Sequence, residues 1–230
     1  MQVERAVWIT RAEPGAAATA ARVRALGFQP LVAPLLSVRG IGARPDIAGY
    51  DALVFTSLNG VRFAPPPAVE AADQTPVLAV GDATAEAARA AGHAEVISAR
   101  GDVSDLARLI GRRFKPGARL LHLSAAEPAG DLAGAVAPLG IVVERATVYE
   151  TTEIAPDPDP LRSGQLHAIL IHSPRAARAL AGWLGERPLP APAICISRAA
   201  AERLELLAGP RPRIAPFPNE DSLLKVLSKA

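Results

Sequence analysis

Hydroxyl side chains recur where an apolar run gives way to a helical pattern. Thr10, the pair Thr56-Ser57, Ser124 and Ser173 all stand at such junctions. A hydroxyl there can cap a helix by accepting a hydrogen bond from an unpaired backbone N–H, and capping alone is one interpretation. In a parallel sheet, however, these junctions share one edge, where ligands bind. Helix N-termini at that edge attract anions, so the pattern also predicts a carboxylate or phosphate site.

Three further residues could act at that edge. Arg11 directly follows the first apolar run and could reach the ligand, or lie in solvent at the surface. Gly81, followed by Thr84, places a glycine where the backbone turns tightly or approaches a ligand. Tyr149 stands at the end of a long extended segment. Its phenol could donate a hydrogen bond to a departing hydroxyl, or its ring could pack at a junction between lobes.

Other kinds of catalytic site have little support. The G-x-G-x-x-G and P-loop patterns are absent from the sequence, which argues against nicotinamide and ATP chemistry. His93, His122, His167 and His172 lack the spacing of metal ligands. Cys195 lies inside an apolar strand, and we interpret it as a core residue rather than a nucleophile. The sequence therefore predicts a site without a metal.

Composition limits the class of partner. The 25 Lys and Arg residues nearly balance the 23 Asp and Glu residues, and no block of like charge occurs, which argues against a nucleic-acid binder. The single cysteine fits a reducing cytosol. The sequence has no signal-peptide pattern at its start and no apolar run long enough to span a membrane. We expect a cytoplasmic protein with no membrane partner.

An internal repeat organises the chain. Four segments match four later segments in the same order: 5–14 with 119–128, 51–57 with 167–173, 79–86 with 195–202, and 105–106 with 222–223. Two copies are too few for a solenoid, so the repeat predicts a pseudo-twofold protein of two lobes.

Each copy alternates short apolar runs with helical patterns, which predicts an α/β fold with parallel sheets. The predicted strands are 6–10, 31–38, 52–56, 77–80, 95–98, 119–123, 141–149, 168–172, 193–196 and 213–215. The predicted helices are 15–26, 57–63, 83–91, 102–113, 129–138, 174–184, 198–207 and 219–228. Pro65-Pro66-Pro67 should end the helix after Ser57 early, because proline removes donors and clashes with the preceding turn.

Two arrangements of the lobes fit the pattern. The segments 31–44 and 141–155 are longer than a core strand needs, and could cross between lobes as extended linkers. The central block would then be an inserted lobe, and the N-terminal residues would rejoin the C-terminal part. Alternatively, the halves follow in tandem and meet near Pro116, where Lys115-Pro116-Gly117 offers a turn.

The succession of short motifs resembles the uroporphyrinogen-III synthase family along nearly the whole chain. The motifs are Val7-Trp8-Ile9-Thr10-Arg11, Pro34-Leu35-Leu36-Ser37, Phe55-Thr56-Ser57-Leu58-Asn59-Gly60-Val61, Ala79-Val80-Gly81-Asp82-Ala83-Thr84-Ala85, Gly101-Asp102-Val103-Ser104-Asp105-Leu106 and Thr147-Val148-Tyr149-Glu150-Thr151. The resemblance implies two flavodoxin-like or Rossmann-like lobes joined by a two-stranded linker, with the active site between them. It favours the crossed arrangement: lobe 1 from 1–36 and 153–230, lobe 2 from 43–146, and linkers 37–42 and 147–152.

The resemblance implies a lyase of tetrapyrrole (haem) biosynthesis that needs no cofactor. Such enzymes cyclise hydroxymethylbilane, which carries eight carboxylates, to uroporphyrinogen III with inversion of ring D and loss of water. Tyr149 matches the family's tyrosine and is the candidate catalytic residue. The candidate substrate-binding residues are Arg11, Thr56, Ser57, Asn59, Gly81, Thr84, Ser173 and Ser197. We expect a monomer that receives its substrate by transient hand-over from the preceding enzyme of the pathway.

The sequence departs from the family in the second copy. Ser197, Ala199 and Ala200 stand where some members have a glycine and a threonine pair, and the helix before Pro65 is short. Two other interpretations fit the repeat: a two-lobed binding protein for a small polyanion without catalysis, and a sugar-nucleotide transferase. The second is weakened because the acidic ribose contact and metal-ligating carboxylates are missing.

Overall fold

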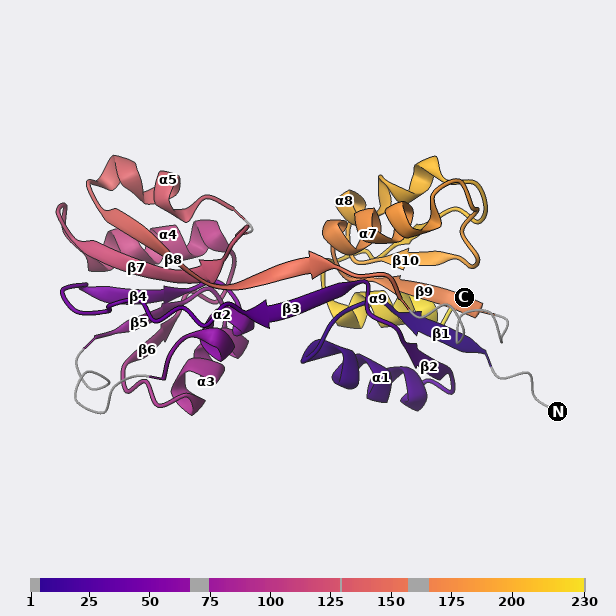
Figure 1. Cartoon of the computed structure of the whole chain (residues 1–230), viewed down its shortest axis with the longest axis horizontal. Helices are drawn as coiled ribbons and strands as arrows, with labels where there is room; N and C mark the ends of the chain where they lie inside the picture. The colour runs from indigo at the N-terminus through magenta and orange to yellow at the C-terminus, as the bar shows by residue number, and fades with distance from the viewer. Residues whose placement is uncertain (1–4, 67–74, 129, 157–165, 230) are drawn as a thin grey trace. The chain divides into compact units, whose positions relative to one another are not determined.

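The computed structural model describes residues 5–66, 75–128, 130–156 and 166–229, and these form two α/β units (Figure 1). Unit 1 comprises Met1–Ser37 with Thr152–Ala230, and unit 2 comprises Val38–Thr151. The chain therefore passes from one unit to the other twice, and Pro116 falls within unit 2. The start of the chain as far as Glu4, together with Pro67 and position 129 of a predicted helix, lies outside the described residues.

Unit 2 is a six-stranded sheet with helices on both faces. Its strands are β3 (Leu36–Gly40), β4 (Ala52–Phe55), β5 (Val77–Ala79), β6 (Val96–Ser98), β7 (Arg119–Ala125) and β8 (Val142–Glu153). Its helices are α2 (Leu58–Phe63), α3 (Asp82–Ala90), α4 (Val103–Arg113), α5 (Leu132–Val136) and the 3-10 turn η1 (Ala137–Leu139). The strand order is β3-β8-β7-β4-β5-β6, and the β8-β7-β4-β5-β6 neighbours pair in parallel.

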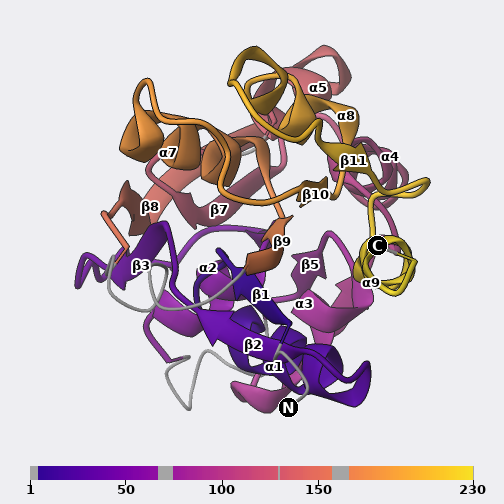
Figure 2. The same cartoon turned by 90° about the vertical axis from the view of Figure 1, so that its right-hand side faces the viewer.

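Unit 1 has a five-stranded parallel sheet. Its strands are β1 (Ala6–Ile9), β2 (Gln29–Val32), β9 (Leu166–Ile171), β10 (Ala193–Cys195) and β11 (Arg213–Ile214), in the order β11-β10-β9-β1-β2. Its helices are α1 (Gly15–Ala25), α7 (Pro174–Leu184), α8 (Arg198–Ala201), the 3-10 turn η2 (Leu204–Leu206) and α9 (Glu220–Leu227). Figure 2 shows α7 and α8 on one face of this sheet and α1 on the other.

The two sheets share one strand order. Reading unit 2 as β6-β5-β4-β7-β8 and unit 1 as β11-β10-β9-β1-β2 aligns β5 with β10, β4 with β9 and β7 with β1, which are the strands that match in the sequence repeat. In unit 2 this order follows the chain as 3-2-1-4-5, the Rossmann-like arrangement. Unit 1 is a circular permutation of it, because β1 and β2 come first in the chain. The predicted α/β class with parallel sheets is confirmed.

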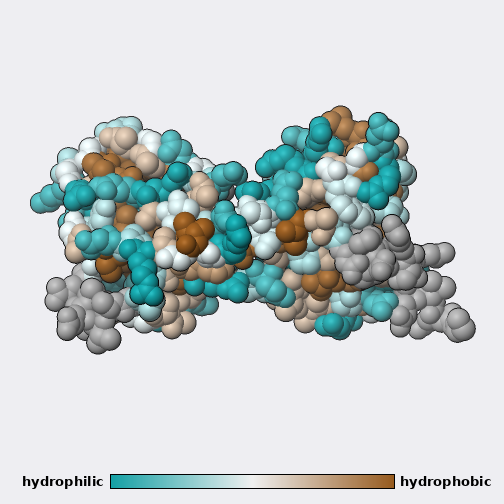
Figure 3. Space-filling model, viewed as in Figure 1, coloured by the Kyte–Doolittle hydropathy of each residue, from teal (hydrophilic) through white to brown (hydrophobic). Residues whose placement is uncertain are grey.

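Each sheet is buried on both faces, which explains its continuous apolar strands. In unit 2, Leu120 and Val54 face α4 and α5, whereas Leu121 and Phe55 face the side of α2 and α3. Figure 3 shows that the visible surface of both units is mostly hydrophilic, with small apolar patches. None of the helices in the described residues is long and apolar enough to cross a membrane.

Most predicted elements are confirmed to within a few residues, and the differences have local causes. The predicted strand 31–38 is wrong: β2 ends at Val32 and β3 begins at Leu36. Pro34 lies between them and has no N–H to continue a ladder. The predicted helix at 129–138 is shorter, because α5 gives way to the 3-10 turn that contains Pro138. The proline run does end α2, at Phe63.

Candidate active site

The site residues of unit 2 gather where β4 and β7 lie side by side. From β4 the chain continues outward to β5 and β6 on one side, whereas β7 leads to β8 on the other. Ligands of open α/β sheets bind at such a switch point, beside the carboxyl ends of the strands. Thr56 and Ser57 directly follow β4. The equivalent point in unit 1 lies between β9, followed by Ser173, and β1, followed by Thr10.

Ser57 and Tyr149 form a hydrogen-bonded pair. The Ser57 Oγ lies 2.8 Å from the Tyr149 Oη, and either hydroxyl can donate. Ser57 is also the N-cap of α2, since its Oγ accepts a hydrogen bond from the Gly60 N–H at 3.1 Å. Tyr149 is only 8% exposed. The N-cap thus takes part in holding the phenol of a nearly buried tyrosine.

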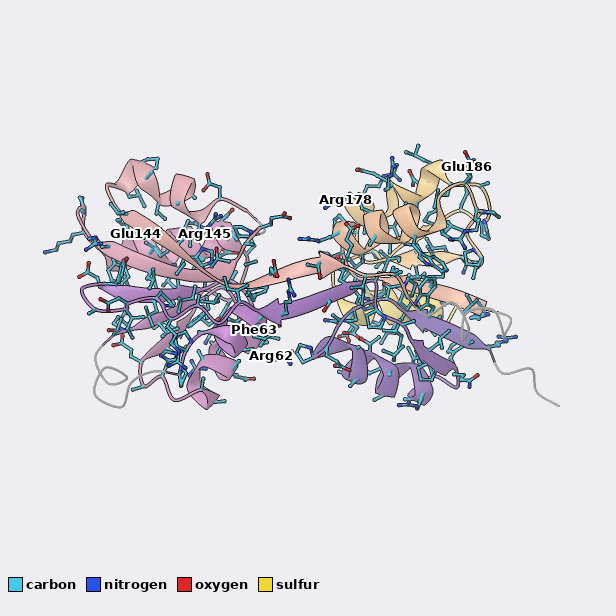
Figure 4. The ribbon with its side chains drawn as sticks, viewed as in Figure 1. Arg62, Phe63, Glu144, Arg145, Arg178 and Glu186 are labelled. Atoms are coloured by element: carbon cyan, nitrogen blue, oxygen red, sulfur yellow. The ribbon has the colours of Figure 1, made fainter. Side chains whose placement is uncertain are left out.

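An irregularity in β8 places Tyr149 against the end of β7. Ser124 pairs with Thr147, whereas Ala125 pairs with Tyr149, so Val148 is an extra residue in the ladder. Such a bulge re-aims the following side chain. Val148 and Tyr149 both pack into the core on the side of α2, where the Tyr149 ring lies 5.9 Å from that of Phe63, labelled in Figure 4. The phenol is therefore held from two sides.

Gly60 allows α2 to approach the sheet. A Cβ at this position would lie 2.7 Å from the backbone oxygen of Leu123, and 3.2 Å from the Phe55 ring. Real Cβ atoms do not come so close to a carbonyl oxygen, so any larger residue would push α2 away from β7. The absence of a side chain at Gly60 thus keeps the Gly60 backbone N–H within hydrogen-bonding distance of the Ser57 Oγ.

Thr56 is hydrogen-bonded to a histidine, whereas its neighbour Ser57 is hydrogen-bonded to a tyrosine. Its Oγ1 lies 2.9 Å from the Nε2 of His122, which is in the middle of β7 and 5% exposed. Burial, together with the positive charge of Arg145, lowers the pKa of the His122 imidazole to about 4. The ring is therefore neutral at neutral pH. Sequence reasoning missed this residue, because only the spacing of metal ligands was considered for the histidines.

The other candidates in unit 2 have different surroundings. Gly81 is the N-cap of α3, with an extended backbone, and a Cβ there would have no contact closer than 4.0 Å. A tight turn therefore does not require glycine at this position. Thr84 is buried in α3, and the buried Oδ1 of Asn59 in α2 has no hydrogen-bond partner. Ser124 is also buried, and its hydroxyl donates to the Ala125 backbone oxygen.

In unit 1 the junction hydroxyls either cap a helix or hydrogen-bond to a neighbouring strand. Ser173 caps α7 by accepting from the Ala176 N–H at 3.1 Å, and Ser197 caps α8 through a longer contact of 3.4 Å. Thr10 is fully buried, and its hydroxyl donates to the Leu170 backbone oxygen at 2.7 Å. It joins β1 to β9 and caps no helix, since the N-cap of α1 is Pro14.

Arg11 is paired within unit 1. Its Nη1 lies 3.1 Å from the Oε2 of Glu220, whose Oε1 accepts a hydrogen bond from Thr19. Gly15 leaves room for the guanidinium, since a Cβ there would lie 2.3 Å from it. Arg11 does come to the carboxyl edge, but a carboxylate of the protein already neutralises it. Both ring nitrogens of nearby His172 are buried without a hydrogen-bond partner.

The arrangement at unit 2 favours proton donation and hydrogen bonding. It brings two hydrogen-bonded pairs to one edge of the sheet: the hydroxyls of Ser57 and Tyr149, and the Thr56 hydroxyl with the His122 ring. The described residues contain no group of three or more His, Cys, Asp or Glu side chains that could hold a metal ion. Cys195 is fully buried, and burial raises the pKa of its thiol to about 12, which agrees with a core role.

Comparisons with known proteins identify the family. The family model of uroporphyrinogen-III synthase HemD matches residues 17–225, whereas no curated protein matches the chain. The structure is similar to uroporphyrinogen-III synthetase from Helicobacter pylori, with 19% identity, 99% of each chain covered and a TM-score of 0.71. It is also similar to a mutant uroporphyrinogen III synthase from Thermus thermophilus, with 19% identity, 98% coverage of each and a TM-score of 0.55. At this identity the structural likeness shows a shared fold, and the family match carries the assignment: the chain belongs to the uroporphyrinogen-III synthase family, whose members are lyases of tetrapyrrole biosynthesis.

Proposed function

We propose that the carboxyl edge of unit 2 carries out the chemistry, with Tyr149 as the catalytic residue for closing hydroxymethylbilane into uroporphyrinogen III. The observation that carries this proposal is the contact of 2.8 Å between the Tyr149 Oη and the Ser57 Oγ. It places a phenol, a weak acid, at the switch point of the sheet in a fixed orientation. An oriented phenol can donate a proton to a leaving group as well as a hydrogen bond to a bound ligand, so the isomer assay below decides between catalysis and binding alone.

The reaction begins with loss of the terminal hydroxyl. Tyr149 donates its proton to the hydroxymethyl oxygen while the C–O bond breaks, and water leaves. The pyrrole nitrogen supplies the electron pair, giving an azafulvene, and the tyrosinate regains a proton when the pyrrole N–H or the new ring carbon is deprotonated. General acid assistance of this kind typically contributes about 10²–10⁴-fold.

Inversion of ring D depends on how the protein positions the two ends of the substrate. The azafulvene carbon must be attacked by the substituted α-carbon of ring D, giving a spiro intermediate, and not by the free α-carbon, which would give isomer I. The older bond from the substituted carbon to the methylene bridge of ring C then breaks, and that methylene carbon bonds to the free α-carbon, which loses its proton. The protein achieves this by holding the flexible chain so that only one closure is within reach. The proton lost from the free α-carbon can return to the Tyr149 oxygen, so the closure needs no second acid or base from the protein.

The remaining candidates bind substrate carboxylates in this proposal. Thr56, Asn59, Gly81 and Thr84 belong to unit 2, and Ser173, Ser197 and Arg11 to unit 1. Asn59 is the exception: its buried, unpartnered Oδ1 is an acceptor, so in this proposal it accepts a hydrogen bond from a substrate pyrrole N–H rather than binding a carboxylate. Arg11 must exchange Glu220 for a substrate carboxylate. The chain acts as a monomer, which light scattering during size-exclusion chromatography tests.

The experiment is an isomer assay. Purified protein is incubated with fresh hydroxymethylbilane, the product is oxidised, and isomers I and III are separated by chromatography. We expect isomer III to predominate. Isomer I alone, as in a reaction without enzyme, would contradict the proposal and favour the non-catalytic binding protein, which would still show saturable binding of the octacarboxylate.

A further inference from the structure

We infer that His122 is a positioning residue: it donates its Nε2–H to the Thr56 hydroxyl, so that Thr56 directs its own proton to a substrate carboxylate. The inference rests on the proposed function and extends it to a residue outside the family motifs quoted above. Its basis is the distance of 2.9 Å between the Thr56 Oγ1 and the His122 Nε2. The two residues come from neighbouring strands, β4 and β7.

The fold does not require this pair. In the repeat, Thr56 aligns with His172 and His122 aligns with Trp8. Unit 1 has the same strand order, but there the Trp8 Nε1–H donates to the Ala33 backbone oxygen at 2.7 Å, and the His172 nitrogens have no partner. The same pair of central strands thus forms with quite different side chains at these two positions. The pair is therefore a feature of unit 2 and not of the fold that the two units share.

His122 can only act as a neutral ring. It is almost fully buried, and burial together with the charge of Arg145 keeps the pKa of the imidazole far below neutrality. A neutral imidazole has one donor and one acceptor nitrogen. With the proton on Nε2, the ring donates to the Thr56 oxygen, and the hydroxyl hydrogen is free for another acceptor.

The charge of the substrate selects this direction. If Thr56 donated to His122, its oxygen lone pairs would face the incoming carboxylate and repel it. If His122 donates instead, the hydroxyl offers a hydrogen atom to the anion. Arg145, labelled in Figure 4, pairs in register with His122 from neighbouring β8, and its guanidinium adds positive charge to this side of unit 2. The surroundings of Thr56 therefore favour a bound carboxylate.

The test compares four single variants, His122→Leu, His122→Gln, His122→Asn and Thr56→Val, with one double variant. The double variant combines His122→Leu with Thr56→Val. The amide nitrogen of glutamine can replace Nε2, whereas asparagine is too short to reach Thr56. We expect His122→Leu to raise KM, and the Kd of the stable octacarboxylate uroporphyrin III, about tenfold, the effect of one hydrogen bond to a charged group. The kcat should change less than about threefold, since the contact serves binding.

Three comparisons separate positioning from mere stability. His122→Gln should recover most of the affinity and His122→Asn should not, whereas the double variant should bind no more weakly than Thr56→Val. His93→Leu is the matched control, because His93 is a buried histidine of the same unit, 7% exposed, beside the Phe55 ring. It should leave KM unchanged.

Additive effects in the double variant, or wild-type affinity in His122→Leu, would overturn the inference. So would equal losses in the glutamine and asparagine variants, which are the informative pair if the leucine variant does not fold. Absence of isomer III from the wild-type protein would contradict the proposed function instead. In that case the uroporphyrin III Kd values would still test the contact between His122 and Thr56.

Discussion

Replacing Tyr149 by phenylalanine removes one oxygen and leaves the ring. The ring keeps its place, because it is almost fully buried and packs on Phe63. The lost oxygen leaves the Ser57 hydroxyl with only the Gly60 N–H as a partner, at a cost of about 1 kcal/mol in the free energy of unfolding. For a chain of this size that corresponds to a fall in Tm of about 2–4 °C.

The effect on the rate should be much larger than the effect on stability. Without the phenol, the leaving hydroxyl must take its proton from water, so kcat should fall about 100-fold, the lower end of general acid catalysis. The lower end applies because a hydroxymethylpyrrole loses its hydroxyl with strong help from the ring nitrogen. The KM should change little, since Tyr149 acts on the leaving group.

Ser57→Ala provides the second arm of a double-mutant cycle. It removes the N-cap of α2, costing about 1 kcal/mol, and frees the Tyr149 phenol to rotate. We expect kcat to fall about tenfold with Tyr149 present, and not at all in the Tyr149→Phe background. Asp131→Ala is the control, since Asp131 caps α5 in the same unit by accepting from the Gly134 N–H at 2.9 Å. It should lose similar stability and keep its kcat.

The assay measures initial rates of isomer III, corrected for the isomer I that forms without enzyme. Tyr149→Phe with the wild-type kcat would remove Tyr149 from catalysis. Full additivity of the two substitutions would show that Ser57 does not act through the phenol. Either result would refute the role assigned to this pair.

Three other predictions concern packing and ionisation. Gly60→Ala should destabilise the protein by about 1–3 kcal/mol in urea unfolding, because its Cβ would meet the Leu123 backbone oxygen at 2.7 Å; a stabilised variant would contradict the close approach of α2. His172 has its pKa lowered to about 4 by burial and by Arg11, so it stays neutral when folded, and stability should be lost as pH falls from about 6.5 towards 4. Between pH 7.5 and 4.5, the free energy of unfolding of His172→Leu should therefore fall by about 2 kcal/mol less than that of the wild-type protein. An equal fall in both proteins would refute the assignment. The Cys195 thiol, fully buried with its pKa raised to about 12, should react with an aromatic disulfide reagent only in denaturant; fast labelling of the native protein would contradict its burial.

The fold could be predicted from sequence because its signals are local. Apolar runs of four to six residues mark strands buried on both faces, and the repeat marks two units with the same strand order. The prediction failed where a single residue overrides the pattern, as at Pro34, which separates β2 from β3. The length of β8 was underestimated, because the continuation past Tyr149 is polar.

The site could be predicted only in part, because its contacts join distant residues. Tyr149 and Ser57 both stood out by type and position, but their hydrogen bond depends on the extra residue Val148, for which the sequence carries no signal. The pairing of Arg11 with Glu220 links residues 209 positions apart. His122 was not recognised for the same reason, because its hydrogen-bond partner, Thr56, directly follows the neighbouring strand β4.

The permuted strand order of unit 1 has a consequence for synthesis on the ribosome. Its two central strands, β1 and β9, are separated in the sequence by all of unit 2, which is translated in the interval. Unit 2 is continuous and can complete its sheet as soon as it leaves the exit tunnel. The nascent β1, whose Val7, Trp8 and Ile9 are fully buried in the finished protein, must meanwhile wait with one unpaired edge. A strand translated before unit 2 is thus enclosed only after unit 2 is complete, and this interval is where chaperone protection would matter most.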